Sequence, residues 1–196
     1  MKTGWIVLIV VVVLGIIGVS SLVSSYNGLV NKQEPVTAAW SQVENVYQRR
    51  ADLVPNLVNT VKGYADFEKS TLTAVIEARA KATSMNIDAS KLTPDQIQKF
   101  QANQGGLSQA LGRLMVVAEQ YPNLKANEGF LNLQAQLEGT ENRITVERQK
   151  YNLAAQTYNT SRRQFPTNIM ANIFGFAEKP YFEAEKGTNV APKVQF

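Results

Sequence analysis

The chain has 196 residues, contains neither cysteine nor histidine, and carries a net charge of +4 from 20 Lys and Arg against 16 Asp and Glu. The absence of these two residue types excludes disulfides, cysteine metal sites, and Ser-His-Asp or Cys-His catalysis. The basic residues are scattered and adjacent only at 49–50 and 162–163, whereas a nucleic-acid-binding protein more often carries a dense basic stripe. We therefore expect no nucleic-acid partner.

The N-terminal segment is expected to cross a lipid bilayer as a helix. An apolar run of 19 residues, interrupted only by two small serines, extends from residue 5 to residue 23. At about 1.5 Å per residue, its length is close to the roughly 30 Å hydrocarbon core of a membrane. The residues predicted to form the membrane anchor are Trp5, Ile6, Val7, Leu8, Ile9, Val10, Val11, Val12, Val13, Leu14, Gly15, Ile16, Ile17, Gly18 and Val19.

Two other interpretations of this segment are considered. In a cleaved signal peptide, Lys2 would supply the positive n-region, but the apolar run is longer than usual and no A-x-A pattern follows it. A buried core helix is disfavoured because no other segment is apolar enough all round to enclose it. Lys2 precedes the span, and Arg49 and Arg50 lie more than 20 residues beyond it. This charge bias favours a single-pass protein of the inner cell membrane, with its body on the non-cytoplasmic side.

The rest of the chain is predicted to be helical. Apolar residues at spacings of three and four predict amphipathic helices over about 35–64, 66–83, 94–120 and 127–163, followed by a short piece at 167–174. Pro35 is expected in the first turn of its helix and Pro55 at a kink, while Thr93 and Pro94 suit an N-cap and the first helical position. The predicted fold is all-α, with a transmembrane helix (1–25), an antiparallel bundle of about four long helices (26–176) and an extended tail (177–196).

Three charged residues, Arg49, Arg50 and Asp52, lie shortly before Pro55 in the sequence. Arg50 fills the slot between two apolar residues of the helical repeat, and Arg49 and Asp52 are three apart and can pair on another face. These groups could bind a partner beside the kink, where a backbone carbonyl is freed. We favour the alternative, in which Arg50 and Asp52 join salt bridges between helices that fix the register of the bundle.

A second charged pair, Glu141 and Arg148, falls within the apolar seam of the 127–163 helix. Either these side chains pair with groups on another helix, or the seam drifts outward and both are solvated. Both interpretations remain open at this point.

Carboxylates are the remaining candidates for acid–base catalysis or metal binding. Glu138 and Glu141 are three apart and are expected near Glu68 and Glu119 if the helices pack as predicted. Such a cluster could act in acid–base catalysis or bind a hard cation, but di-metal helical bundles rely on Glu-x-x-His. We therefore expect no catalytic residue, no metal and no cofactor.

Several short sequence stretches, spread along nearly the whole chain, match the pattern of one known family. They include 26–30 (YNGLV), 39–42 (AWSQ), 49–58 (RRADLVPNLV), 118–126 (AEQYPNLKA) and 141–144 (ENRI). Together they resemble the LemA family of bacterial membrane-anchored proteins. The resemblance implies a single-pass protein with a helical-bundle domain, and it supplies no enzyme mechanism.

The sequence therefore predicts a protein that is not an enzyme. The favoured function is a membrane-tethered, self-associating interaction or scaffolding module, a homo-oligomer with further protein partners of unknown identity and with the lipid bilayer around its N-terminal helix. The alternative is a lipid- or envelope-binding protein that acts through the amphipathic 167–174 segment and the basic pairs.

Overall fold

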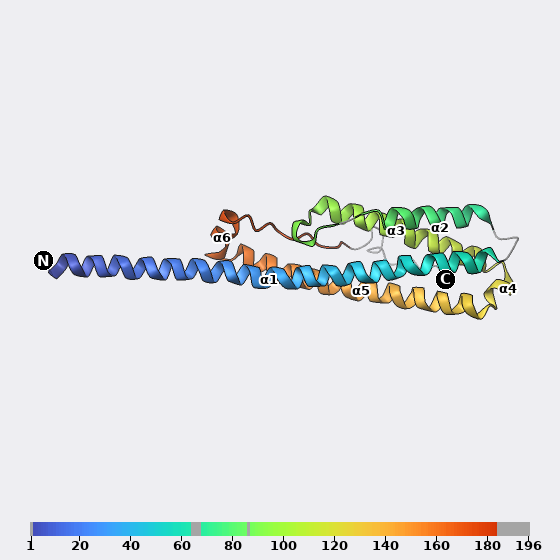
Figure 1. Ribbon diagram of the computed structural model, residues 1–196, viewed down its shortest axis with the longest axis horizontal. Coiled ribbons are helices and arrows are strands. Elements are labelled where there is room, and N and C mark those ends of the chain that lie inside the picture. The colour runs from blue at the N-terminus through green and yellow to red at the C-terminus, as the bar shows by residue number, and fades with distance from the viewer. Residues whose placement is uncertain (1, 64–67, 86, 184–196) are drawn as a thin grey trace, which may run out of the picture. The chain divides into compact units, whose positions relative to one another are not determined.

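A computed structural model describes residues 2–63, 68–85 and 87–183. Within these ranges the protein is all-α, as predicted, and contains no strand (Figure 1). The elements in chain order are α1 (Lys2–Lys62), α2 (Lys69–Ala82), the short 3-10 turn η1 (Ala89–Lys91), α3 (Pro94–Ala118), α4 (Pro122–Lys125), α5 (Glu128–Arg163) and α6 (Thr167–Ile173).

Helix α1 corrects one prediction. The apolar N-terminal segment and the first helix of the body form one continuous helix, so Pro35 lies inside α1 rather than in a first turn. A proline inside a helix leaves the carbonyl four residues earlier without its helical donor. At Pro35 that carbonyl belongs to Asn31, and both residues are exposed, so water can satisfy it. The helix also continues through Pro55.

The helix starts follow local capping chemistry. Thr93 is the N-cap of α3, as predicted, and forms a capping box in which its side chain and backbone bond reciprocally with Gln96. Ahead of α5, the Asn127 Oδ1 accepts a hydrogen bond of 3.0 Å from the Phe130 N–H. The predicted start of the second helix near Asp66 lies outside the described residues.

The described residues divide into two compact units. The first contains residues 2–49, 88–92 and 139–179, and the second contains residues 50–63, 68–85, 87, 93–138 and 180–183. In the first unit, the rings of Trp40 (α1) and Tyr151 (α5) meet edge to face at 5.6 Å and are fully buried. Aromatic pairs in this geometry stabilise a core beyond the area that they bury.

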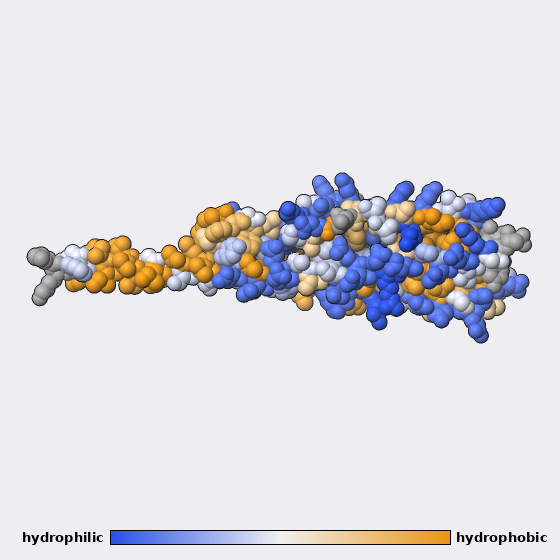
Figure 2. Space-filling model, in the orientation of Figure 1, coloured by the Kyte–Doolittle hydropathy of each residue, from blue (hydrophilic) through white to orange (hydrophobic). Residues whose placement is uncertain are grey.

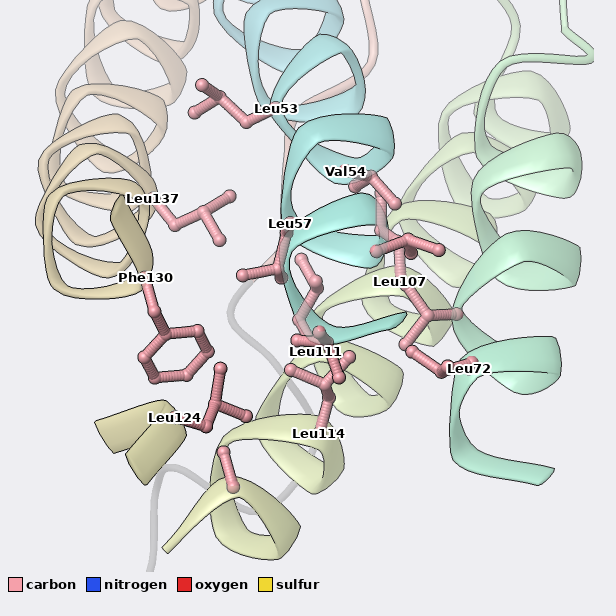
Figure 3. Packing of buried hydrophobic residues seen from close by; sticks show 14 of the residues in the cluster. Leu53, Val54, Leu57, Leu72, Leu107, Leu111, Leu114, Leu124, Phe130 and Leu137 are labelled. Atoms are coloured by element: carbon pink, nitrogen blue, oxygen red, sulfur yellow. The ribbon is translucent and has the colours of Figure 1, made fainter. Parts of the chain in front are cut away.

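The second unit has an apolar core built from the end of α1, α2, α3, α4 and the start of α5. Figure 3 shows its leucines, valines and Phe130 pointing toward one another from these helices. Because the apolar residues recur at helical spacing, each helix presents one stripe to this common core. The labelled members are Leu53, Val54, Leu57, Leu72, Leu107, Leu111, Leu114, Leu124, Phe130 and Leu137.

Candidate functional site

Arg50 is buried in the second unit, with 2% of its surface exposed. It occupies a core-facing position of α1, four residues before Val54. Burial of a guanidinium is expensive unless its N–H groups find acceptors, because an arginine stays charged in proteins.

Helix α3 supplies acceptors for Arg50 from two residues four apart. The Arg50 Nη1 donates to the Ser108 Oγ at 2.7 Å, and Nη2 donates to the Gln104 Oε1 at 2.7 Å and to the Gln104 backbone carbonyl at 3.1 Å. Gln104 is itself buried, and its Nε2 donates to the carbonyl of Ala82 at 3.1 Å. Arg50 and Gln104 thus connect α1, α3 and the C-terminal end of α2 through one polar network.

A second arginine satisfies the carbonyl that Pro55 frees. Pro55 has no N–H, so the Ala51 carbonyl four residues earlier loses its helical donor. The Arg79 Nε, from α2, donates to this carbonyl at 2.8 Å. The carbonyl beside Pro55 is therefore held within the unit by α2.

The other charged residues singled out from the sequence are more exposed than Arg50. Arg49 and Asp52 flank the buried positions of α1 and are exposed. In the first unit, Glu141 is exposed and Arg148 is half-buried, while Thr140, next to Glu141, is 2% exposed. Thr140 therefore occupies the core-facing position between Leu137 and Ile144.

Sequence reasoning missed the partners of Arg50. Gln104 lies four residues after Phe100 and three before Leu107, so it interrupts an apolar repeat as a polar member. That position is the signal that could have identified it as buried. Ser108 and Arg79 carry no comparable signal, because polar residues on helices usually face solvent.

A polar cluster in the first unit holds the segment after α6 against α5. The Tyr158 hydroxyl donates to the Ala177 carbonyl at 3.0 Å. The Asn159 side chain accepts from the Lys179 N–H at 2.9 Å and donates to the Lys179 carbonyl at 2.8 Å. Both residues belong to the Tyr-Asn pair at 158–159, which therefore contributes hydrogen bonds as well as packing.

Lys179 is the second buried cation, with 3% of its surface exposed. Its Nζ donates to the Ser90 carbonyl at 2.8 Å and lies 5.9 Å from the centre of the Tyr158 ring. Burial lowers the pKa of Lys179 because desolvation disfavours the ammonium form, and the nearby Asp88 carboxylate acts weakly in the opposite direction. Burial also raises the pKa of the Tyr158 hydroxyl, against a smaller effect of Arg162.

Two of the four carboxylates considered for metal or acid–base chemistry make local contacts. Glu119 pairs with Lys125, and Glu68 accepts hydrogen bonds from Ser70 and Thr71. Across the described part of the chain, no group of three or more acidic residues is placed to hold a metal ion.

The N-terminal part of α1 is apolar and exposed. Among the described residues, one helix is long and apolar enough to cross a membrane, and none of its apolar window is buried. Figure 2 shows this segment as a continuous hydrophobic surface. The absence of burial argues against the interpretation of this segment as a core helix.

Sequence comparisons identify relatives over most of the chain. A family model described as the LemA family matches residues 39–196. Magnetosome protein MamQ 2 of Paramagnetospirillum magneticum is 31% identical over 95% of this chain and 75% of its own length. Magnetosome protein MamQ of Magnetospirillum gryphiswaldense is 28% identical over 90% of this chain and 71% of its own length. Protein LemA of Metamycoplasma hominis is 26% identical over 82% of this chain and 69% of its own length.

Proposed function

Because the chain belongs to the LemA family, we propose that it is a single-pass membrane protein whose helical body is a tethered, self-associating interaction or scaffolding module and not an enzyme. The anchor comprises residues 1–25, the bundle 26–176 and the tail 177–196. The observation that carries the proposal is the apolar segment of α1, which has the length to span a bilayer and is exposed throughout.

The chemistry of the body supports a non-enzymatic role. The sequence has no cysteine and no histidine. The most elaborate polar network, around Arg50, uses its hydrogen bonds to join helices to one another. Two of the relatives are named for the magnetosome and not for a reaction, which also supports a structural or organising role.

Self-association is supported by apolar side chains on the outer surface of α5. Val146 and Leu153 lie seven residues apart and are 46% and 65% exposed. Residues at this spacing share one helix face, and a repeated apolar face is the usual contact between helices of different subunits.

Mass measurement of the purified chain in mild detergent tests the proposed self-association. We expect a dimer or a larger assembly, and a shift toward monomer when Leu153→Glu is introduced. Ile76→Glu is the control, since it replaces an exposed apolar residue of α2. A wild-type chain that is strictly monomeric and co-purifies with no other protein would contradict the proposal.

The absence of native cysteine allows the membrane topology to be tested with a single introduced cysteine. We propose that the body lies on the non-cytoplasmic side of the inner membrane, because Lys2 precedes the span and positive residues favour the cytoplasm. A cysteine introduced in the tail should react with a membrane-impermeant thiol reagent in intact spheroplasts. Protection until lysis would place the body in the cytoplasm.

A second candidate function is binding to lipid or to the cell envelope through residues 167–174. One observation favours it, namely the exposure of Ile169 and Ile173 on α6, at 47% and 65%. This function is compatible with the first, because an anchored scaffold can also contact the membrane surface.

A further inference from the structure

Helix α6 has one face packed on the first unit and another face exposed. Met170 and Ala171 are buried and hold α6 in place. Ile169 and Ile173, four residues apart on α6, share a helix face and are 47% and 65% exposed. Phe165, in the turn before α6, and Phe174, its C-cap, are 80% and 57% exposed and extend the exposed apolar surface at the two ends of the helix. We call these four residues the α6 patch.

The α6 patch lies beside the end of the apolar segment of α1. The Tyr26 ring meets the Phe174 ring edge to face at 5.1 Å and the Phe176 ring at 5.4 Å. Tyr26 is three residues past Val23, or about 4.5 Å along the helix axis. Figure 2 shows hydrophobic surface where α6 lies beside α1. Tyrosine at the end of a membrane span is typical of the interface between hydrocarbon and water.

The backbone around the α6 patch is held in place by hydrogen bonds. Gly175 has a φ of 71°, which ends α6, and the Phe176 N–H donates back to the Ala171 carbonyl at 2.9 Å. The Phe176 carbonyl accepts from the Arg162 Nε at 2.6 Å. These hydrogen bonds therefore fix the turn that follows the patch, and its aromatic rings already contact Tyr26 without bound lipid.

We propose that the α6 patch inserts into the interfacial region of the same bilayer that α1 crosses. The inference rests on the proposed membrane anchor, and its partner is the lipid surface itself. An amphipathic segment in this position buries its apolar face about 5–10 Å into the boundary between headgroups and acyl chains. Arg163, exposed at the end of α5, lies on the polar side of this boundary.

The chain contains a matched control for the patch. Ser41 of α1 is exposed, as Ile173 is, and both residues belong to the first unit. Ser41 lies 15 residues beyond Tyr26 on the same helix. At about 1.5 Å per residue, this level is about 22 Å further from the membrane than Tyr26. If only exposure mattered, labels at the two positions would give the same collision rates. Contact with the bilayer would make these rates differ.

The test uses the full chain in lipid vesicles with one nitroxide label at a time. Because the chain has no native cysteine, Val13→Cys, Ser41→Cys and Ile173→Cys each give a single site. Collision with oxygen reports lipid, and collision with a water-soluble nickel complex reports solvent. We expect a ratio of oxygen to nickel collisions that is highest at 13, intermediate at 173 and lowest at 41, with the value at 173 several-fold above that at 41.

The three labels separate the possible failures. A label at 13 that reports water would overturn the proposed anchor. A label at 13 in lipid, together with equal solvent access at 173 and 41, would overturn the α6 inference alone. Loss of both collision rates at 173, with spin–spin broadening, would show that a second copy covers the patch and would also overturn it. Ile169→Cys gives a repeat within α6 if the label at 173 disturbs folding.

Discussion

Among the described residues, each unit buries one cation, Arg50 or Lys179, and the two are accommodated in different ways. Arg50 donates to a side-chain amide, a backbone carbonyl and a hydroxyl. Lys179 donates through Nζ to one backbone carbonyl and lies near an aromatic ring. The guanidinium remains charged and presents a planar set of donors, whereas an ammonium can lose its proton when it is desolvated. A buried arginine therefore needs several hydrogen-bond acceptors placed around its guanidinium, and a buried lysine does not.

The two buried cations connect different parts of the chain. Gln104 and Ser108 come from α3, and Gln104 continues the network to α2, so the hydrogen bonds around Arg50 connect three helices. Lys179 holds one end of the segment after α6 to the Ser90 carbonyl, and Asn159 holds its backbone. We infer that Arg50 determines the register of its unit, whereas Lys179 fastens a surface segment.

The largest effect is expected for Arg50→Met. This change removes the donors that Arg50 gives to the buried Gln104 Oε1 and to the Ser108 Oγ, at a cost of about 1–3 kcal/mol in the free energy of unfolding. Chemical denaturation of the full chain in detergent, followed by circular dichroism, measures it. Arg49→Met is the matched control, since Arg49 is exposed and surface changes usually stay within about 0.5 kcal/mol. Equal losses for the two variants would show that the buried position of Arg50 gives it no special role in stability.

Arg50→Lys places the other type of cation in the buried site of the second unit. A lysine cannot reach the Gln104 and Ser108 acceptors with a planar fork, so we expect a loss of about 1–3 kcal/mol. The same denaturation measurement applies. A variant as stable as the wild type would show that the charge, and not the geometry of the donors, is what the site requires.

Arg79→Met is expected to cost about 1–2 kcal/mol, because the Ala51 carbonyl beside Pro55 loses its donor. In Pro55→Ala, the restored N–H can bond to this carbonyl within the helix. Arg79→Met should therefore cost less in the Pro55→Ala background than in the wild type. A double-mutant cycle measures this coupling, and strict additivity would contradict the assigned role of Arg79.

The smallest effect is expected for Lys179→Met, and it should depend on pH. Since the folded-state pKa of Lys179 is lowered by burial, the wild type bears a cost when this group is protonated. That cost is relieved as pH rises from the folded-state pKa toward the unfolded value of about 10.4. The stability of the wild type relative to Lys179→Met should therefore increase over this range. A difference that stays constant with pH would contradict the effect of burial.

The sequence predicted those features that depend on local pattern. The helices, the Thr93 cap and the unusual position of Arg50 follow from periodicity and from residues a few positions apart. The acceptors of Arg50 lie 54 and 58 residues away, and no local rule connects them to it. The continuity of α1 through Pro35 was missed because proline is a local signal for a helix boundary. On an exposed face, the one lost hydrogen bond is not enough to end the helix.

If α1 is a membrane anchor, its continuity limits how far the helical body can move in search of a partner. A flexible linker would let a tethered domain sample a wide volume above the membrane. Here the residues between Val23 and Trp40 are helical, so Trp40 is held about 25 Å along a stiff axis from the end of the apolar segment. If α1 is the anchor, two copies can meet only when their spans lie side by side. Lateral density in the membrane would then govern association more than concentration in the surrounding solution.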